Sequence, residues 1–515
     1  MYSKIYGAGI TGLEARIIQV EADVSNGLPV FHMVGVLASA VKEARERVRI
    51  SLQNSGFRIP AKRITVNLSP ADLRKDGSGY DLPIAVSLLA ASGMLPQNTD
   101  KSILMAGELG LNGQICSIQG ALAMALQAKK EGFRRFLLPK ENTREAAMVE
   151  GIDIIGVSTL IEAVEYLKGS LELSPVRVDL NALRRKFEEN TWEDFDEVYG
   201  QENAKKALVT AVSGGHNILL IGAPGTGKTM LAKRLPGIMP LLTREEAVEL
   251  TKIYGIAGLL REDMPLVFRS PFRAPHHSIP AAAMAGGGKD PVPGEITLSH
   301  NGVLFLDELP EFARNTLEIL RQPIEEGQIH IARLGHSYSF PADMIVVGAM
   351  NPCKCGYYPD INRCRCTQGQ IQSYLSRISE PLLDRMDICV EMERTDGRNR
   401  KCQGKASAEI RRQVQGAREI QAERYRDEKI TRNSQLSGRL LKKYCRLERK
   451  EQRCFGDLRE QLGLSARGAE RMLRVARTLA DIEQSGEIRE THLLQASVYK
   501  SINRKYWGME AAYEG

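Results

Sequence analysis

One segment restricts the fold of this chain more than any other: HNILLIGAPGTGKTMLAKRL, which begins at His216. Its apolar run ends in the pattern G-x-x-x-x-G-K-[ST] at 222–229, and helix-forming residues follow. In such a strand–loop–helix unit, backbone N–H groups and the helix N-terminus surround phosphate oxygens. The segment therefore predicts an α/β domain with a parallel sheet and a bound nucleotide.

The residue types of this loop assign its contacts with ATP. Lys228 is placed to contact the β- and γ-phosphates, and Thr229 is placed to ligate Mg²⁺. The predicted nucleotide-binding residues are Gly222, Ala223, Pro224, Gly225, Thr226, Gly227, Lys228 and Thr229.

A second apolar run, in NGVLFLDELPEF, ends in the acidic pair Asp307 and Glu308. A carboxylate at the end of a buried strand must be paired or must bind a metal ion. We expect Asp307 to hold Mg²⁺, directly or through water. We expect Glu308 to polarise the attacking water as a general base.

Three further polar residues are candidates to contact the γ-phosphate of ATP. Asn351 ends the apolar run MIVVGAMN, where its amide is suited to the γ-phosphate and the lytic water. Arg385, in EPLLDRMDICVEM, offers the fixed fork of donors that suits a phosphoryl group in transfer, in cis or from a neighbouring subunit. Arg377, in YLSRISEP, is the competing candidate.

The 515 residues predict about three domains, because domains typically span about 100–200 residues. Residues 1–168 alternate strand-like and helix-like runs, and residues 169–195 are a polar connector. The predicted ATPase core spans 196–395, and a mostly helical region spans 396–515. No apolar run is long enough to cross a membrane, and the first residues lack a signal-peptide pattern. We therefore expect a cytoplasmic protein without a membrane partner.

The formal net charge of +7 is uneven, because residues 401–460 hold 17 Lys and Arg against 9 Asp and Glu. This local excess fits a polyanionic partner, although a solvated helical face has the same composition.

Four of the nine cysteines lie close together, at Cys353, Cys355, Cys364 and Cys366. Four thiolates suit tetrahedral Zn²⁺, and a reducing compartment favours a metal over disulfides. The C-x-C spacing is tighter than that of most zinc sites, and reduced structural cysteines are the alternative. With a metal, the loop would be a rigid knuckle whose Lys354, Arg363 and Arg365 are placed to touch DNA phosphates.

In their order along the chain, 222–229, Asp307-Glu308, Asn351, Arg385 and the helical tail resemble the AAA+ ATPases. The resemblance implies that Asn351 is sensor 1 and that Arg385 is the arginine finger. It also implies that Arg467, in LSARGAERMLRVARTLADI, is the sensor 2 arginine, with Arg471 one helical turn later as the alternative.

The stretch FRSPFRAPHHSIPAAAMAGGGKDPVPGEITLSHNGVLFLDELPEF resembles the magnesium-chelatase-like branch of that superfamily. The resemblance implies an insert near 268–295 and a hairpin near 325–343, both directed toward the pore of a ring. Lys289 and Arg333 in these segments are candidate phosphate contacts. His276-His277 fit a pore-loop role or turn packing better than a zinc site, because no third ligand lies nearby.

Residues 105–169 resemble the proteolytic domain of Lon, and KDGSGYDLPIAVSLLAASG resembles its serine-bearing segment. In that register, the serine position holds Gly79 and the lysine position holds Met124. Ser78 lies one residue away. Ser–Lys catalysis needs both groups, so we expect a Lon-like domain that is not a protease.

A Lon-like domain, a chelatase-like AAA+ core and a helical lid form the layout of the YifB/ComM family, which the whole chain resembles. Its most specific segments include GLPVFHMVGV, PGEITLSHNGVLFLDELPEF and AMNPCKCGYY. The resemblance implies a hexameric, ATP-hydrolysing DNA helicase that drives branch migration in recombination or natural transformation. Two alternatives remain: a magnesium-chelatase motor subunit, and an ATP-switched protein-remodelling chaperone or scaffold.

Overall fold

The computed structural model describes residues 1–96, 102–189, 193–260, 266–288, 291–333, 336–360, 362–394 and 406–507. The chain forms two compact units. The first comprises Met1–Phe187 with Arg244–Phe268, and the second comprises Glu188–Thr243 with Arg269–Gly515. Among the described residues, no helix combines the length and the apolar character needed to cross a bilayer.

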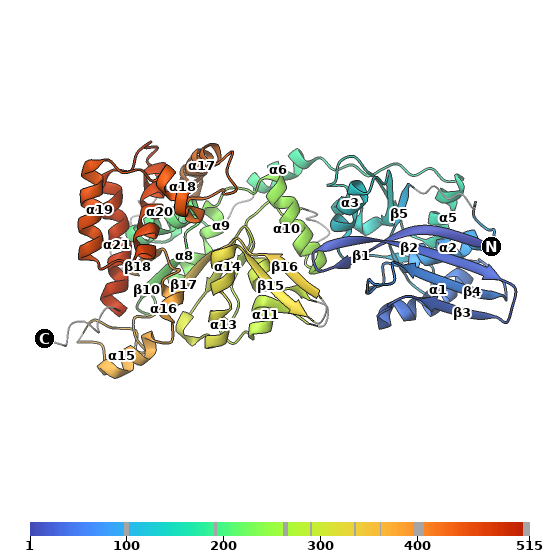
Figure 1. Cartoon of the computed structure of the whole chain (residues 1–515), viewed down its shortest axis with the longest axis horizontal. Helices are drawn as coiled ribbons and strands as arrows, with labels where there is room; N and C mark the ends of the chain where they lie inside the picture. The colour runs from blue at the N-terminus through green and yellow to red at the C-terminus, as the bar shows by residue number, and fades with distance from the viewer. Residues whose placement is uncertain are drawn as a thin grey trace. The chain divides into compact units, whose positions relative to one another are not determined.

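The first unit is built on a mixed seven-stranded sheet in the order β3-β4-β2-β1-β5-β8-β9. Figure 1 labels β1, β2, β3, β4 and β5 of this sheet. β1 and β2 form an antiparallel hairpin whose two-residue turn begins at Gly12, which has a φ of +61°. On β2, side chains alternate between core and surface, as expected of a sheet strand. The strand bounds are β1 (Tyr2–Thr11), β2 (Glu14–Ser25), β3 (Val30–Val34), β4 (Arg63–Ser69), β5 (Ile103–Met105), β8 (Arg135–Pro139) and β9 (Asp153–Val157), with a small ribbon of β6 (Glu108–Leu109) and β7 (Ile115–Cys116).

Helices pack on this sheet, and one of them is central to the core. α2 buries every one of its residues, which explains its continuous apolar sequence. The helices are α1 (Ser39–Asn54), α2 (Asp81–Ala91), α3 (Ala121–Lys130), α4 (Thr143–Ala146), α5 (Leu160–Lys168) and α10 (Arg244–Ile256), with a 3₁₀ turn η1 (Lys140–Asn142).

Two segments differ from the predicted organisation. The predicted connector contains a helix, α6 (Leu180–Glu189), which begins where the Asp179 carboxylate accepts hydrogen bonds from the N–H groups of Asn181 and Ala182. α10 lies within the predicted span of the ATPase core, yet it packs against α3 and groups with the first unit. Its apolar face therefore completes the first core rather than the second.

The second unit holds a five-stranded parallel sheet in the order β11-β14-β17-β10-β18. β10, β14 and β17 are buried along their whole length, which fits strands covered on both faces. The bounds are β10 (Ile218–Gly222), β11 (Phe272–Arg273), β14 (Val303–Leu306), β17 (Ile345–Met350) and β18 (Ile388–Met392). The parallel α/β core predicted from the sequence is confirmed.

Both predicted insert regions contain a two-stranded ribbon. Residues 268–295 include β12 (Gly286–Gly287) and β13 (Val292–Pro293), and residues 325–343 include the hairpin of β15 (Gln328–Arg333) and β16 (His336–Pro341). Lys289 and the side chain of Arg333 lie outside the described residues. The surrounding helices are η2 (Phe195–Glu197), α7 (Glu202–Gly214), α8 (Lys228–Lys233), α9 (Leu235–Ile238), α11 (Ala281–Ala285), α12 (Glu295–Leu298), η3 (Leu309–Glu311), α13 (Arg314–Glu318), α14 (Arg321–Glu326), α15 (Gln368–Leu375) and α16 (Glu380–Leu383).

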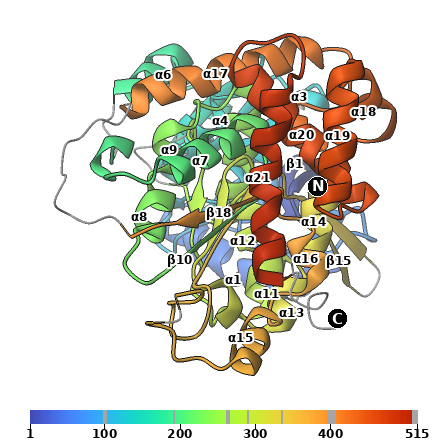
Figure 2. The same cartoon turned by 90° about the vertical axis from the view of Figure 1, so that its left-hand side faces the viewer.

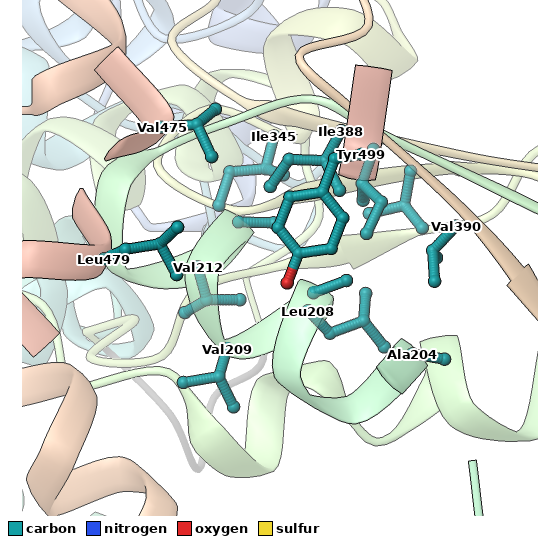
Figure 3. Close-up of a cluster of buried hydrophobic side chains, with 14 of the residues drawn as sticks. Ala204, Leu208, Val209, Val212, Ile345, Ile388, Val390, Val475, Leu479 and Tyr499 are labelled. Atoms are coloured by element: carbon teal, nitrogen blue, oxygen red, sulfur yellow. The ribbon is translucent and has the colours of Figure 1, made fainter. Parts of the chain in front are cut away.

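The C-terminal region is helical, as predicted, and shares its core with the sheet. Figure 3 shows side chains of α7, β17, β18, α20 and α21 meeting in one apolar cluster that includes Leu208, Ile345, Ile388, Val475 and Tyr499. α21 also packs along β18 (Figure 2). Residues on both sides of position 395 thus belong to one core. The elements are α17 (Ser407–Arg424), η4 (Asn433–Gln435), α18 (Gly438–Tyr444), α19 (Arg449–Gln461), α20 (Ala466–Ile482) and α21 (Glu490–Trp507).

Candidate active site

The predicted phosphate loop joins the end of β10 to the start of α8. Gly225 and Gly227 have φ values of +77° and +88°, which glycine adopts without steric cost. Lys228 is the first residue of α8, and its Nζ donates to the carbonyl oxygens of Gly222 (2.6 Å) and Ala223 (3.0 Å). The loop therefore curls around its own lysine and holds the ammonium group inside the turn.

The predicted magnesium ligands contact each other. The hydroxyl of Thr229 donates to Oδ2 of Asp307 over 2.7 Å, and Asp307 directly follows β14. Mg²⁺ prefers hard oxygen ligands such as a hydroxyl and a carboxylate, so the pair fits this ion. Burial lowers the pKa of the Lys228 ammonium, while the negative charges of Asp307 and Glu308 oppose that shift.

Asn351 completes this group because β17 lies between β14 and β10 in the sheet. Asn351 follows β17, and its Oδ1 accepts a hydrogen bond from Nζ of Lys228 over 3.1 Å. Three parallel strands therefore bring Lys228, Asp307 and Asn351 to one edge of the sheet.

Glu308 lies beside an unexpected neighbour. Its backbone φ of +53° is left-handed, a strained value for a residue with a side chain, and its carboxylate is 62% exposed. Nδ1 of His277 lies 3.6 Å from its Oε2, and the rings of His276 and His277 are tilted by 35° with centroids 4.0 Å apart. The histidine pair therefore lies at the predicted general base, a position that its turn-rich sequence context did not indicate.

The candidate arginines Arg385 and Arg467 lie together in a cavity that the phosphate loop does not line. Arg385, Arg467, Arg471 and Arg474 line one cavity of about 680 Å³. The guanidinium of Arg385 donates to Glu325 and to the carbonyl of Pro381. Burial lowers the pKa of Arg385, Glu325 opposes the shift, and the neighbouring arginines add to it.

Several buried guanidinium nitrogens of this cavity lack a partner. Nε of Arg385, Nη1 of Arg471 and Nε of Arg474 make no hydrogen bond within the part of the chain that the structure describes. Buried N–H donors normally have a hydrogen-bond partner, so these guanidinium groups can still donate hydrogen bonds to an anion in the cavity.

The arginine cavity and the phosphate loop lie at opposite ends of β10. Asn217, which lines the cavity, immediately precedes this strand, whereas Gly222 is its last residue. Five residues of strand span about 17 Å at about 3.3 Å each. Arg385 and Arg467 are therefore not brought to the phosphate loop of their own chain.

Arg377, the competing candidate, has a different environment. Its Nη1 donates to Oε2 of Glu311 over 2.8 Å and to the carbonyl of Pro310. Half of its side chain is exposed, so this is a surface ion pair close to the turn that follows Glu308.

The four clustered cysteines have the geometry of a metal site. Sγ of Cys353 lies 3.4 Å from that of Cys355 and 3.8 Å from that of Cys364, and Cys355 and Cys364 are 3.6 Å apart. All four sulfurs, including that of Cys366, lie within 4.8 Å of one another. Four thiolates around Zn²⁺ at about 2.3 Å would be about 3.8 Å apart, so the cluster fits a tetrahedral ion.

The cysteine loop lies against the phosphate loop. Cys353 is fully buried only two residues after Asn351. A Cβ added to Gly356 would lie 2.4 Å from Cδ of Pro224, so the two backbones are in close contact there. The sequence alone indicated a metal knuckle, but its place beside the nucleotide loop emerges only from the fold.

The Lon-like positions hold no catalytic pair. Gly79 precedes α2, and Met124 is buried on α3. The hydroxyl of the neighbouring Ser78 donates a hydrogen bond to the carboxylate of Glu108. Ser–Lys catalysis would need a lysine at this serine instead.

Three family models match successive parts of the chain. The family described as "Magnesium chelatase, subunit ChlI" matches residues 194–400. "Subunit ChlI of Mg-chelatase" matches residues 20–142, and "Magnesium chelatase, subunit ChlI C-terminal" matches 404–500. "Lon protease homolog 2, peroxisomal" of Caenorhabditis elegans is 28% identical over 182 residues, which cover 34% of this chain and 23% of that protein.

Other relatives match along nearly the whole chain. "Uncharacterized protein YifB" of Salmonella typhimurium is 43% identical, covering 96% of both chains. The YifB protein of Escherichia coli is 42% identical over 98% of this chain and 97% of its own. "Competence protein ComM" of Haemophilus influenzae is 40% identical over 97% of each. With its parallel-sheet ATPase core, its Lon-like first unit and relatives of this identity, the chain belongs to the YifB/ComM family of magnesium-chelatase-like AAA+ proteins.

Proposed function

We propose that this protein is an ATP-hydrolysing ring motor that acts on DNA, as a helicase or branch-migration factor in recombination or natural transformation. The AAA+ family implies ATP and Mg²⁺ as its nucleotide and ion. The relative from Haemophilus influenzae carries the name of a competence protein, which supports a role in DNA uptake or its later steps.

The main observation in favour of a ring is that Arg385 lies at the opposite end of β10 from the phosphate loop of its own chain. A head-to-tail contact would place the amino edge of one sheet against the phosphate loop of the next chain, and such contacts form a ring when the rotation between subunits closes. In that arrangement, Arg385 and Arg467 of one subunit reach the ATP of its neighbour. An arginine supplied in this way stabilises the charge that develops on the transferred phosphoryl group.

Each remaining residue has a defined task. Lys228 and the loop N–H groups bind the phosphates. Thr229 and Asp307 would hold Mg²⁺, which neutralises charge on the phosphate oxygens. Glu308 accepts a proton from the attacking water, and Asn351 orients that water through its amide. His277 contacts this carboxylate from the side, with Nδ1 3.6 Å from Oε2 of Glu308.

We also propose that the four thiolates hold a structural Zn²⁺. The ion would fix the loop from Cys353 to Cys366 in one conformation, and its contact at Gly356 would support Pro224 in the phosphate loop. Zinc would therefore contribute to stability and to the shape of the nucleotide site, without taking part in hydrolysis.

A branch-migration assay tests the proposed function. The full chain with ATP and Mg²⁺ should separate a labelled four-way DNA junction, and Glu308→Gln should bind the junction but leave it intact. Arg16→Ala, which removes an exposed ion pair with Glu14 outside every candidate site, is the matched control. A wild-type protein that hydrolyses ATP but neither binds nor moves the junction would point to a chelatase-type or protein-remodelling motor instead.

A further inference from the structure

The first unit contains a groove that the ATPase site does not use. It has a volume of about 810 Å³ and is lined by residues of β3, the end of α1 and the loop 56–62 that leads into β4. Figure 1 labels these two strands and the helix. β3 pairs only with β4, so the groove borders the free edge of the seven-stranded sheet.

The charged residues that line this groove are all basic: Arg49, Arg58 and Lys62, with no acidic residue among them. Arg49 is paired with Glu46 over 3.0 Å. Arg58 and Lys62 are exposed, and neither forms an ion pair with another described residue. Two free cations at one rim favour a polyanionic ligand.

The floor of the groove is aromatic and apolar. Phe31 and Phe57 pack one side against the core of the unit and remain partly exposed on the other. Val30 beside them is 40% exposed. A positively charged rim above fixed aromatic rings is the arrangement that binds single-stranded nucleic acid, because phosphates follow the charge and bases stack on the rings.

We propose that this groove binds single-stranded DNA, with phosphates on Arg58 and Lys62 and bases against Phe31 and Phe57. The proposal rests on the proposed function, since it assigns the Lon-like unit a direct contact with the DNA on which the motor acts. Duplex DNA fits less well, because its bases are stacked on one another and do not present their faces to protein rings. The groove would thus hold a displaced strand.

The test is the affinity of the full chain for a fluorescein-labelled oligo-dT, measured by anisotropy across a salt series. For single strands, each lost phosphate contact lowers the salt slope by about 0.7, so Arg58→Gln with Lys62→Gln should lower it by about 1.4. Starting from equal affinities in 1 M salt, this difference in slope makes the double variant bind oligo-dT about 25-fold more weakly than the wild type in 0.1 M salt.

Matched variants separate charge from stacking. Lys129→Gln with Lys130→Gln removes two exposed charges from α3 in the same unit and should leave the affinity unchanged. Phe57→Leu keeps the apolar floor but removes the ring, and it should weaken oligo-dT binding at least about fivefold while sparing duplex binding. Unchanged basal ATPase activity and melting temperature verify that each variant is folded.

The experiment distinguishes failure of the groove as a DNA site from failure of the proposed function. Wild-type binding that Arg58→Gln/Lys62→Gln leaves intact would overturn the groove as the site and would leave the motor hypothesis standing. Loss of oligo-dT binding in the Lys129→Gln/Lys130→Gln control to the same extent would overturn it too. Absence of any wild-type DNA binding at low salt would instead overturn the proposed function itself.

Discussion

Two inactive variants of this protein should regain ATPase activity when they are mixed. Lys228→Ala removes the phosphate-binding ammonium group, and Arg385→Ala removes the cavity arginine at the other end of β10. If Arg385 acts on the nucleotide of a neighbouring subunit, one variant supplies the phosphate loop and the other supplies the arginine. A shared interface then contains both intact groups.

The size of the effect follows from the geometry. About 17 Å of strand separate Asn217 from Gly222, which is too far for Arg385 to serve its own loop. Loss of an arginine of this kind lowers kcat about 10³–10⁵-fold, so each variant alone should be nearly inactive. In a ring assembled at random from equal amounts, about a quarter of the interfaces pair an intact Lys228 with an intact Arg385. We therefore expect about a quarter of the wild-type rate per subunit.

The assay is steady-state phosphate release after the differently tagged variants exchange subunits. Retention of one variant on a resin specific for the other variant's tag shows that mixed assemblies have formed. Mixed assemblies that hydrolyse ATP no faster than either variant alone would refute the reasoning, because they would show that Arg385 does not complete a neighbour's site.

Other predictions concern single residues. Glu308→Gln should lower kcat about 10²–10⁴-fold and keep ATP affinity, measured with a fluorescent ATP analogue; unchanged turnover would remove Glu308 as the base. Zinc analysis of the purified protein should find about one ion per chain, and Cys364→Ser should lose it and melt at a lower temperature. A wild-type protein free of metal, with the same melting temperature as the variant, would contradict the zinc site. Burial raises the pKa of Glu145 to about 7 from an ordinary 4.5, so the folded chain keeps a proton that the unfolded chain has lost. Stability should therefore fall by about 1–3 kcal/mol as the pH rises from about 5 to 7, and Glu145→Gln should remove that fall in denaturant titrations. Parallel pH profiles for the two proteins would contradict the role of this carboxyl group.

Much of the nucleotide site follows from the sequence, because its residues lie at the ends of apolar runs. Gly222 ends a buried strand, Asp307 and Asn351 each directly follow one, and parallel strands carry such residues to one edge. The hairpin at 328–341 was also predictable, since it lies in a segment that resembles an insert of the chelatase-like branch.

Other features depend on contacts that no local pattern encodes. α10 is amphipathic, and the pattern of its apolar residues does not reveal which of two cores it joins. The pairing of His277 with Glu308 joins two turns that are distant in the chain, and such turns have little periodicity to interpret. The resemblance assigned roles to Arg385 and Arg467, but only the fold shows that both lie far from their own phosphate loop.

The central claim is that ATP hydrolysis at 222–229 drives movement on DNA. Its most direct test is the ATPase rate of the full chain with no DNA, with oligo-dT, with duplex DNA and with a branched junction, at low salt. We predict that DNA stimulates hydrolysis, that branched or single-stranded DNA does so most strongly, and that rising salt abolishes the stimulation. An ATPase rate that none of these DNAs changes, in a protein that does not bind them, would contradict the account.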